Sequence, residues 1–452
     1  MRSKNAVIVH VGKTVSKVSL WSSAGTLLDG QQHIAPPHAT GGIRRLDAEG
    51  IGAWLLEALT QYADENVGTI IPIAHGATLA AINADGLAFA PLDHDEPLPK
   101  DIAAAYRNDR DASAPTRSPR TSGGQDLGAR LYWMEQITPN ATEGATILPW
   151  AQYWGWFLSG RAATEVTGLG SHGDLWCADT GRYSPLALSR GWARKFAPIM
   201  SAYEPLGFIR PELAKRSGLP RITRILTGMS DRHAALLAAR AFAEIGMSDA
   251  TLITTDNQPV AMRIVSDPLC ADGYPVQRNC FLEVDPYDRP VAAARFKATR
   301  QWGSAGNLGD FAAPARPDPE HETSKTESGQ RVDGLNAALE ADAALSTIGS
   351  RTRLLVSGDL ADLDDFAPAL AALRPDMKVY TAPSVDLVAL GAMRLIDRKF
   401  ALGAALRPAD ALSDDIRACR RDWQDAKART GLFRAWSNHR DTRNARRPAI
   451  SL

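Results

Sequence analysis

Apolar, β-branched runs alternate with segments of helical periodicity in the first part of the chain. Residues 6–11 and 18–21 form two such runs, and the Ser-Ser-Ala-Gly stretch at 22–25 is typical of a turn into residues 26–28. This pattern predicts a β-meander. Apolar residues at helical spacing predict an amphipathic helix over residues 47–64, followed by a buried strand over 68–73. Strands that are first antiparallel and then joined through helices predict a mixed α/β sheet.

The same alternation returns in the second half of the chain. Predicted strands cover residues 251–254, 281–284, 353–356 and 379–380. Predicted helices follow the last two strands, one ending at residue 373 and one over residues 385–400. A turn at residue 227 is expected to lead into a further helix that ends near residue 241. The repetition predicts two related α/β domains that meet near residue 235.

Two polar segments interrupt this pattern. Residues 108–125 contain Pro, Ser, Arg and a pair of glycines, which is typical of a loop on the surface or over a cleft. Residues 313–331 are charged and contain Pro, which predicts a mobile insertion. Between them, residues 127–137 and 148–158 are apolar and rich in Trp and Tyr.

The composition is that of a globular protein with two domains of ordinary size. Of the 452 residues, 44% are hydrophobic and 23% are charged. The 51 basic residues balance 51 acidic ones, which argues against nucleic acid or an anionic membrane as a partner. We expect no signal peptide and no membrane span, since no apolar run is long enough. The four cysteines form no CxxC pair, so a reducing, cytoplasmic location is expected.

The stretch VIVHVGKTVSK, residues 7–17, carries the first candidate chemistry. An apolar run ends there in Gly12, Lys13 and Thr14, and the backbone N–H groups of such a hairpin bind the phosphates of a nucleotide. Lys13 adds a positive charge, and Lys17 lies near enough along the chain to reach the same phosphates. A surface hairpin with two solvated lysines explains the motif equally well if it stands alone. His10 occupies the strand end, where such a site usually has a carboxylate.

Asp231, in the stretch GMSDRHAA, is the best candidate for a general base. It follows a turn that contains glycine and opens an Ala-rich helix, where the positive end of the helix dipole favours a carboxylate. A plain N-cap is the commoner role of a lone Asp at a helix start, and the two roles can coexist.

Two further places suggest contacts with a small polar substrate. In AHGAT, Gly76 would let a substrate approach the strand end closely, and His75 could hydrogen-bond one of its hydroxyl groups. A lone His is more often structural. Trp154 and Trp156 would stack on a sugar or belong to a helix face in the core, and the pattern does not decide between these alternatives.

Six pieces of the sequence, in one order, resemble the FGGY carbohydrate kinases of the actin-like ATPase superfamily. HVGKTVSKVSLWSSAGTLL resembles the family's first phosphate motif, and AHGATLAAINADGLAFAPLDHDEP its first sugar-facing loop. LGARLYWM and LPWAQYWGWFLSGRAATEVTGLGSHGDLW are similar to the central segment of members described as L-rhamnulose- or L-fuculose-kinase-like. GLPRITRILTGMSDRHAA resembles the stretch with the catalytic aspartate. TTDNQPVAM lies where the second phosphate turn is expected, and LLVSGDL with ALGAMRL where the adenosine motif is expected.

The resemblance implies an α/β protein with two actin-like, ribonuclease H-like domains and a cleft between them. Residues 1–235 would bind the sugar and catalyse the reaction, and residues 236–452 would bind the nucleotide. The implied reaction is the phosphorylation by Mg·ATP of a hydroxyl of a small ketose or deoxyketose, with Asp231 as the general base. The expected partners are this sugar and ATP, and the resemblance is compatible with a homodimer.

The resemblance also assigns the remaining site residues. The sugar would contact His75, Gly76, Ser230 and Arg232. ATP would contact Gly12, Lys13, Thr14, Lys17, Thr255 and Gly358. Mg²⁺ would lie near His10 and Asp256.

Three positions depart from the family pattern. His10 replaces an aspartate that helps to hold Mg²⁺, Asp256 stands in a turn where the family has Thr-Gly-Thr, and SGD at 357–359 replaces Gly-Gly. Asp256 would either repel the phosphates or supply the missing metal ligand. The departures leave a second hypothesis open, namely a catalytically weakened relative that binds sugar or nucleotide as a sensor or partner protein.

Overall fold

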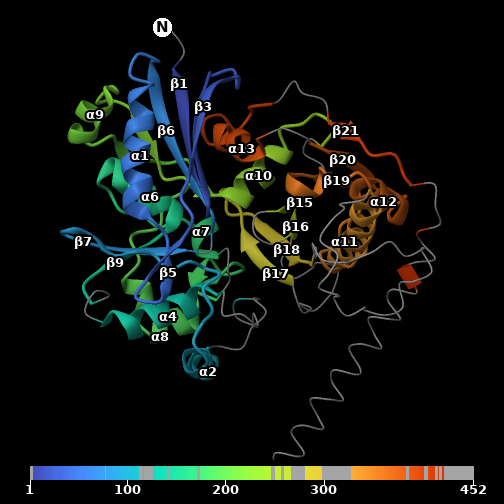
Figure 1. Ribbon diagram of the computed structural model, residues 1–452, viewed down its shortest axis with the longest axis horizontal. Helices are drawn as coiled ribbons and strands as arrows, with labels where there is room; N and C mark the ends of the chain where they lie inside the picture. Colours follow the sequence, from blue (N-terminus) through green and yellow to red (C-terminus); the bar gives the residue numbers. More distant parts are fainter. Residues whose placement is uncertain are drawn as a thin grey trace, which may run out of the picture.

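Two mixed β-sheets organise the part of the chain that the structure describes (Figure 1). The structure is a computed structural model, and it describes residues 4–76, 78–110, 116, 126–139, 143–170, 174–245, 250–255, 259–265, 280–297, 327–382, 386–401, 406–412, 416, 420 and 421. Within these residues, no helix has the length and apolar character that crossing a membrane requires.

The first sheet is built by the first half of the chain. Its spatial order is β12 (Pro205–Phe208), β13 (Arg224–Leu226), β6 (Val67–Ala74), β1 (Asn5–Val11), β2 (Val15–Trp21) and β3 (Leu27–Ile34), and β14 (Met229–Ser230) also pairs with β6. The strands β1, β2 and β3 form the predicted antiparallel meander. The strands β1, β13 and β14 run parallel to β6.

The second sheet repeats this plan. Its spatial order is β17 (Cys280–Val284), β18 (Pro290–Arg295), β16 (Pro259–Ile264), β15 (Ala250–Thr255), β19 (Arg353–Val356), β20 (Lys378–Thr381) and β21 (Arg407–Pro408). The strands from β17 to β15 are antiparallel neighbours, and β15, β19 and β20 are parallel. The repetition confirms the predicted α/β fold with two related domains.

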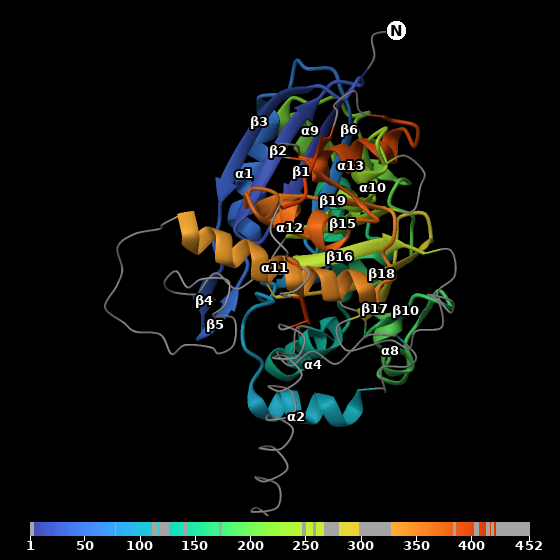
Figure 2. The same cartoon turned by 90° about the vertical axis from the view of Figure 1, so that its right-hand side faces the viewer.

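Helices cover the outer faces of both sheets. In the first domain, α1 (Ala48–Thr60) and α6 (Trp150–Ser159) pack on a core that includes Val9, Ile70 and Trp154. Asp47 starts α1 by accepting a hydrogen bond from the N–H of Gly50 at 2.8 Å. In the second domain, α11 (Glu327–Thr347) and α12 (Phe366–Leu373) cover the sheet, as the view in Figure 2 shows.

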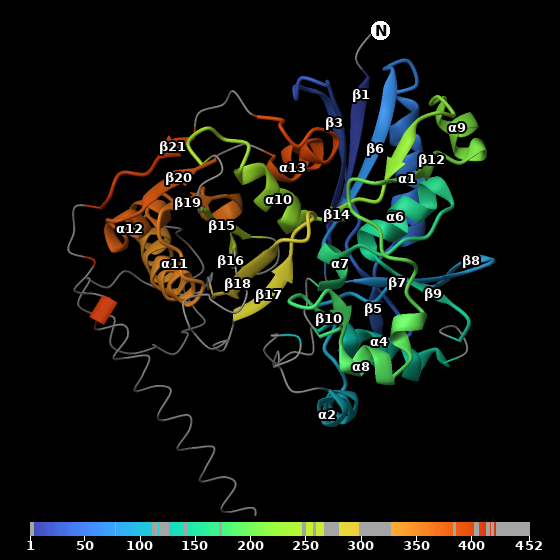
Figure 3. The same cartoon turned by 180° about the vertical axis from the view of Figure 1, so that it is seen from behind.

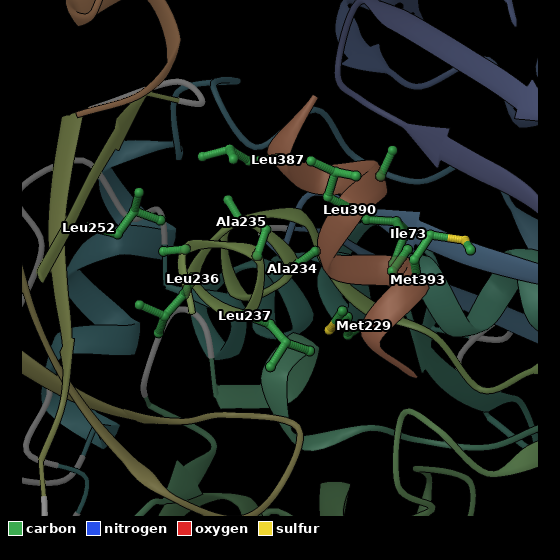
Figure 4. Close-up of a cluster of buried hydrophobic side chains, with 14 of the residues drawn as sticks. Ile73, Met229, Ala234, Ala235, Leu236, Leu237, Leu252, Leu387, Leu390 and Met393 are labelled. Atoms are coloured by element: carbon green, nitrogen blue, oxygen red, sulfur yellow. The ribbon is translucent and has the colours of Figure 1, made fainter. Parts of the chain in front are cut away.

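A middle layer of two helices joins the domains. Side chains of α10 (Asp231–Ala239) and α13 (Leu387–Ile396) share one core with Ile73 of the first sheet and Leu252 of the second (Figure 4). The two helices touch backbone to backbone, because a Cβ on Gly391 would lie 1.8 Å from the carbonyl oxygen of Ala234. Residue 235, the predicted domain boundary, thus lies inside α10.

Most of the smaller elements lie around the lower end of the first sheet in Figure 1, whereas residues 211–217 pack beside α1 nearer its upper end. They are β4 (His38–Thr40), β5 (Ile43–Arg45), β7 (Leu79–Asn83), β8 (Gly86–Phe89), β9 (Thr146–Pro149), β10 (Trp176–Cys177), β11 (Arg182–Tyr183), α2 (Lys100–Asp109), α4 (Leu127–Ile137), α7 (Val166–Gly170), α8 (Pro185–Ser189), α9 (Pro211–Ser217) and the 3₁₀ turn η1 (Trp192–Arg194). A second 3₁₀ turn, η2 (Gly358–Leu360), follows β19 in the second domain.

The structure corrects two predicted segments and assigns elements to a third, which the sequence marked only as apolar. Residues 327–331, predicted to be a mobile insertion, begin α11, because charged residues accept a helical backbone and Leu335, Ala338 and Leu345 further along anchor the helix on the second sheet. Residues 313–326 of that prediction lie outside the described residues. Residues 108 and 109 end α2 rather than open a loop, and most of residues 110–125 lie outside the described residues. The apolar segment 148–158 divides into the end of β9 and α6.

Candidate active site

The carboxyl ends of β1, β6 and β14 lie side by side because these strands are parallel. His10 of β1 and Met229 of β14 both lie opposite Ile73 of β6. The residues that follow each strand therefore meet at one edge of the sheet. His75 follows β6, and Asp231 follows β14 as the first residue of α10. The fold thus brings together His10, His75 and Asp231, which the sequence singles out separately.

Asp231 is a buried carboxylate beside an imidazole. Its Oδ2 lies 3.7 Å from Nε2 of His10, which is too far for a hydrogen bond but close enough for electrostatic attraction when the imidazole is protonated. Burial on its own raises the pKa of Asp231, but His10, His75 and the N–H of Arg232, which donates to Oδ1 at 2.7 Å, together bring that pKa below its usual value. The carboxylate is therefore ionised at neutral pH and can accept a hydrogen bond from a hydroxyl group.

His75 is a neutral histidine in a buried position. It is 2% exposed, and burial, reinforced by the neighbouring His94, lowers its pKa to about 3. The two imidazole rings lie 5.3 Å apart between centroids and are tilted by 46°. Within the described residues, neither ring nitrogen of His75 has a hydrogen-bond partner. Because a buried donor and acceptor are costly to leave unbonded, His75 is well suited to bind the hydroxyl groups of a ligand. Gly76 follows it in the turn after β6.

The turn between β1 and β2 has the tight geometry of the predicted phosphate hairpin. The N–H of Gly12 donates to the carbonyl oxygen of Val15 at 3.2 Å. A Cβ on Gly12 would lie 2.6 Å from that oxygen, so the turn requires glycine. The side chains of Thr14 and Lys17 are exposed, and Lys17 lies opposite His10 in the sheet register.

The ammonium group of Lys13 faces an acidic stretch at the end of the predicted sugar-facing segment. It contacts the carboxylate of Asp95 and lies 3.2 Å from Oδ1 of Asp93, which is fully buried. Nη1 of Arg44 approaches Oδ2 of Asp93 at 3.4 Å. Nε2 of His94, which lies between the two aspartates, is 3.4 Å from Oδ1 of Asp95. Lys13 thus links the phosphate hairpin to the loop that carries the neighbour of His75.

The ends of the parallel strands β15 and β19 form a second candidate region. The hydroxyl oxygen of Thr255 accepts a hydrogen bond from the N–H of Asp359 at 3.0 Å. Gly358 has a φ of +70°, and a Cβ at this residue would lie 2.4 Å from the Thr255 hydroxyl oxygen. The structure therefore joins Thr255 and Gly358, two residues predicted to bind the nucleotide. Asp256 lies outside the described residues.

The side chains of Ser230 and Arg232, predicted to contact the sugar, are bound by protein groups. Oγ of Ser230 lies 2.7 Å from Nδ1 of His233. The guanidinium group of Arg232 contacts the carboxylate of Glu283 on β17. These contacts tie both neighbours of Asp231 into the interior.

Sequence reasoning missed five residues of this region. They are Asp93, His94, Asp95, His233 and Glu283. The run LDHDEP carries a detectable signal, since four of its six residues are ionisable and it ends the piece that resembles the sugar-facing loop. His233 lies two residues beyond the candidate base, whereas Glu283 sits in an ordinary strand sequence, FLEV, and only the tertiary structure singles it out.

The aromatic face of α6 belongs to the core. Trp150 and Trp154 are fully buried. The side-chain amide of Gln152 donates to the carbonyl oxygens of Thr227 and Gly228 at 3.1 Å each, and so supports the turn that leads into α10.

A groove on the first domain contains none of the predicted site residues. It has a volume of ≈ 990 Å³ and lies between the β7–β8 turn, the end of α6, β12 and α9, elements that appear together in Figure 3. Trp156 and Phe208 line it together with the arginines Arg161, Arg210, Arg221 and Arg224. The groove is therefore separate from the edge of the sheet where Asp231 lies.

The donor groups around Asp231 are few for a metal site. Among the described residues, no group of three or more His, Cys, Asp or Glu side chains is arranged to hold a metal ion.

Cys177, one of the four cysteines in the sequence, is a buried free thiol.

Comparison with known proteins places this geometry in a family. A sequence profile described as "Carbohydrate kinase FGGY, C-terminal domain" matches residues 304–404. No curated protein matches the chain in sequence. The crystal structure of a carbohydrate kinase from Novosphingobium aromaticivorans is 38% identical, covers 95% of this chain and 99% of that chain, and superposes with a TM-score of 0.81.

Two more distant structures share the fold. A gluconate kinase from Lactobacillus acidophilus is 15% identical with a TM-score of 0.75, over 95% of this chain and 98% of that chain. A ligand-bound xylulose kinase from the same organism is 14% identical with a TM-score of 0.75, over 96% and 100%. The identity to the Novosphingobium structure, over nearly the full length of both chains, together with the profile match, establishes more than the fold. The chain belongs to the FGGY family of carbohydrate kinases.

Proposed function

We propose that this carbohydrate kinase phosphorylates a hydroxyl of a small ketose or deoxyketose of the L-rhamnulose or L-fuculose type, with Asp231 as the general base. The observation that carries the proposal is the pairing of an ionised, buried Asp231 with a neutral, unbonded His75 at one edge of the first sheet. The carboxylate would accept the proton of the attacking hydroxyl, which is the main proton transfer that phosphoryl transfer requires of the protein.

His75 would orient the sugar. A neutral imidazole offers one donor and one acceptor, and this combination matches a hydroxyl group, which can both accept and donate. Gly76, in the turn beside it, would leave room for the sugar at the strand end. The sugar type rests on the similarity of residues 127–134 and 148–176 to the central segment of rhamnulose- and fuculose-kinase-like members.

ATP would lie between the phosphate hairpin and the second candidate region. Bound ATP supplies the phosphoryl group, and Gly12, Lys13, Thr14 and Lys17 on one side and Thr255 and Gly358 on the other would hold it. The requirement for glycine at residues 12 and 358 supports this assignment, since backbone N–H groups in such turns bind phosphate. When ATP binds, the ammonium group of Lys13 would leave the aspartates that it contacts in the free protein and bind a phosphate group of ATP instead. We further propose that residues 1–235 form the sugar-binding domain and residues 236–452 the nucleotide-binding domain, with α10 at their boundary.

The residues beside Asp231 do not fit a magnesium site built by the protein alone. Mg²⁺ prefers oxygen ligands, whereas the side chain that lies 3.7 Å from the Asp231 carboxylate is the imidazole of His10. We propose that Mg²⁺ is held chiefly by the phosphates and water, as is usual for this ion in kinases, with His10 and Asp256 beside it.

Replacement of the base tests the proposal. Asp231→Asn should abolish nearly all sugar-dependent ATP turnover while the sugar still binds, because the amide keeps the shape but cannot accept a proton. Coupled-enzyme kinetics and isothermal titration with candidate ketoses give the two readouts. Substantial turnover by the folded variant would assign the base to another residue.

A second function is favoured by one specific observation. Lys13 is engaged by Asp93 and Asp95, and His10 occupies the usual place of a carboxylate, which suits a protein that binds its ligands but transfers phosphate poorly. Thermal-shift titrations with ATP, with and without Mg²⁺, distinguish the two functions. A kinase should be stabilised more strongly by ATP with Mg²⁺ than by ATP without it, whereas a weakened relative should show no such dependence on magnesium.

A further inference from the structure

We propose that Glu283 is a positioning residue of the kinase reaction. From the edge strand of the second sheet, it would hold the first turn of α10 through Arg232 and His233, and so fix the place of Asp231. The inference rests on the proposed role of Asp231 as the base, and it adds a residue of the other domain to the catalytic arrangement.

Both oxygens of Glu283 face the first turn of α10. Oε1 contacts the guanidinium group of Arg232, and Oε2 lies 3.3 Å from Nε2 of His233. Glu283 and His233 are fully buried, and Arg232 is nearly so. A buried carboxylate is normally found only with ion-pair and hydrogen-bond partners. Its partners here are two consecutive residues that follow the candidate base directly.

His233 passes the restraint on to the other side of Asp231. Its Nδ1 lies 2.7 Å from Oγ of Ser230. The backbone N–H of Ser230 also donates to the hydroxyl oxygen of Thr167 on α7 at 2.9 Å. Asp231 therefore stands between two residues that are held from opposite sides, Ser230 by the first domain and Arg232 by the second. The series of contacts from Ser230 to His233 and from His233 to Glu283 therefore crosses the boundary between the domains.

The charges around Glu283 agree with this role. The groups that face it are Arg232 and His233 from α10 and Arg295 from β18. Arg232 and Arg295 also lie over the ring of Phe281, at 5.7 Å and 5.0 Å from its centroid. Burial, with Arg232 also contributing, brings the pKa of His233 well below its usual value, so its ring is neutral. A neutral ring whose proton lies on Nε2, the nitrogen nearest to Glu283, accepts at Nδ1 from the Ser230 hydroxyl.

The contact between His233 and Glu283 is close without being aligned as a hydrogen bond. Because the two residues belong to different domains, a small approach of β17 to α10 would complete the bond. Bonds of this kind in catalytic sites often tighten only in the productive complex. Glu283 would therefore exert its full restraint on Asp231 when the domains close over their substrates.

The experiment compares Glu283→Gln with a matched control. Asp342 on α11 is also a buried carboxylate of the second domain, but its partners are Arg374 at the end of α12 and Arg420, at 2.5 Å each, rather than residues of α10. We expect Glu283→Gln to lower kcat by about tenfold to a hundredfold while the KM values for sugar and ATP stay within about threefold, since a displaced base affects the transition state alone. Asp342→Asn should leave kcat per folded molecule unchanged.

Two variants of His233 keep the test decisive if Glu283→Gln does not fold. His233→Asn can still hydrogen-bond Ser230, whereas His233→Leu cannot. The proposal requires Asn to restore a substantial part of the kcat that Leu loses. Equal kcat values for these variants, or a normal kcat for folded Glu283→Gln, would overturn it.

The outcome also separates this inference from the proposed function. Retained turnover in Asp231→Asn would refute the assignment of the base. An inactive Asp231→Asn together with a fully active Glu283→Gln would refute the positioning role only. If both assignments hold, Glu283→Gln should cause little further loss in the Asp231→Asn background, because the two changes remove the same function.

Discussion

The ends of β1, β6 and β14 and the ends of β15 and β19 are equivalent places in two related sheets, yet they are built differently. In the first region, ionisable side chains face one another, and His75 lacks hydrogen-bond partners within the described residues. In the second region, a threonine hydroxyl, a backbone N–H and a glycine define the turn. The geometry of the first region depends on which side chains are present and on their charge. The geometry of the second depends on Gly358, which has no side chain and can therefore lie against Thr255.

The largest effect on this contrast should come from His75→Leu. Loss of two hydrogen bonds to the sugar, at about 0.5–1.5 kcal/mol each, should raise the KM for sugar by about 10- to 100-fold. The free protein should be as stable as before or more stable, because the substitution removes an unbonded polar group from the interior. Steady-state kinetics and thermal unfolding measure the two effects. His38→Leu, at an exposed histidine of β4, is the control. An unchanged KM would place the sugar elsewhere.

A smaller effect should come from Glu165, which supports the first region through Thr167 and Ser230. We expect this residue to make the stability of the protein depend on pH. This residue is fully buried and holds Thr167, whose hydroxyl donates to its Oε2 at 2.5 Å. Burial raises the pKa of Glu165 to about 8, against hydrogen bonds from Thr167 and Gly168 that lower it. The folded protein thus binds a proton that the unfolded chain has already released, so stability should fall as pH rises toward 8.

The cleanest interval for this measurement is pH 6.5 to 8. The buried histidines His75, His94 and His233 have lowered pKa values, so the unfolded chain binds more protons at these positions near pH 6.5, which opposes the effect of Glu165 only at the lower end of the interval. Over the interval, Glu165 should reduce the free energy of unfolding by about 2 kcal/mol, and Glu283, with a pKa of about 7, acts in the same direction. Urea unfolding of Glu165→Gln should show a flatter profile. A slope equal to that of the wild type would assign the effect to other groups.

The smallest effect should come from the second region, through Gly358→Ala. Its left-handed backbone costs an alanine about 1–2 kcal/mol, and the contact with the Thr255 hydroxyl adds to this cost. Gly181→Ala is a matched control, since Gly181 has a φ of +61° and no atom within 4 Å of an added Cβ. The excess loss of stability in Gly358→Ala, measured by urea unfolding, reports the contact alone. ATP affinity should fall only in Gly358→Ala, by about tenfold, and equal affinities would exclude this turn from the nucleotide site.

Local pattern was sufficient for most strands and helices, because each is specified by its own periodicity. Residues 353–356 form a strand with the predicted bounds, and residues 127–137, singled out only as an apolar segment, form a helix. The first part of α11 was not predicted, since its charged sequence resembles that of a mobile segment and the apolar residues that anchor the helix come later. Position in the sequence also singled out His10 and His75, because each stands at the end of an apolar run, and Asp231, because it follows a turn that contains glycine and opens a helix.

The partners of these residues could not be predicted in the same way. Lys13 meets Asp93 and Asp95 through the fold of a long connection, and nothing near Glu283 in the sequence connects it with α10. Such pairs depend on how the two sheets and the layer of helices pack together. The spacing of apolar residues within one segment carries no information about that packing. Resemblance to a family identifies residues with a shared role, whereas contacts of this kind arise from the particular side chains of this chain.

The contact between Gly391 and Ala234 has a consequence for how relatives of this protein can diverge. Gly391 lies in ALGAMRL, a piece that resembles the adenosine motif, but in this structure it is required by the close approach of α13 to α10. Because the atoms in contact are backbone atoms of residue 234, a glycine should be retained at residue 391 whatever side chain stands at residue 234, even in a descendant that no longer binds a nucleotide. A glycine retained at this position would therefore be explained by the packing of α13 on α10, and it would not be evidence that the protein is still catalytically active.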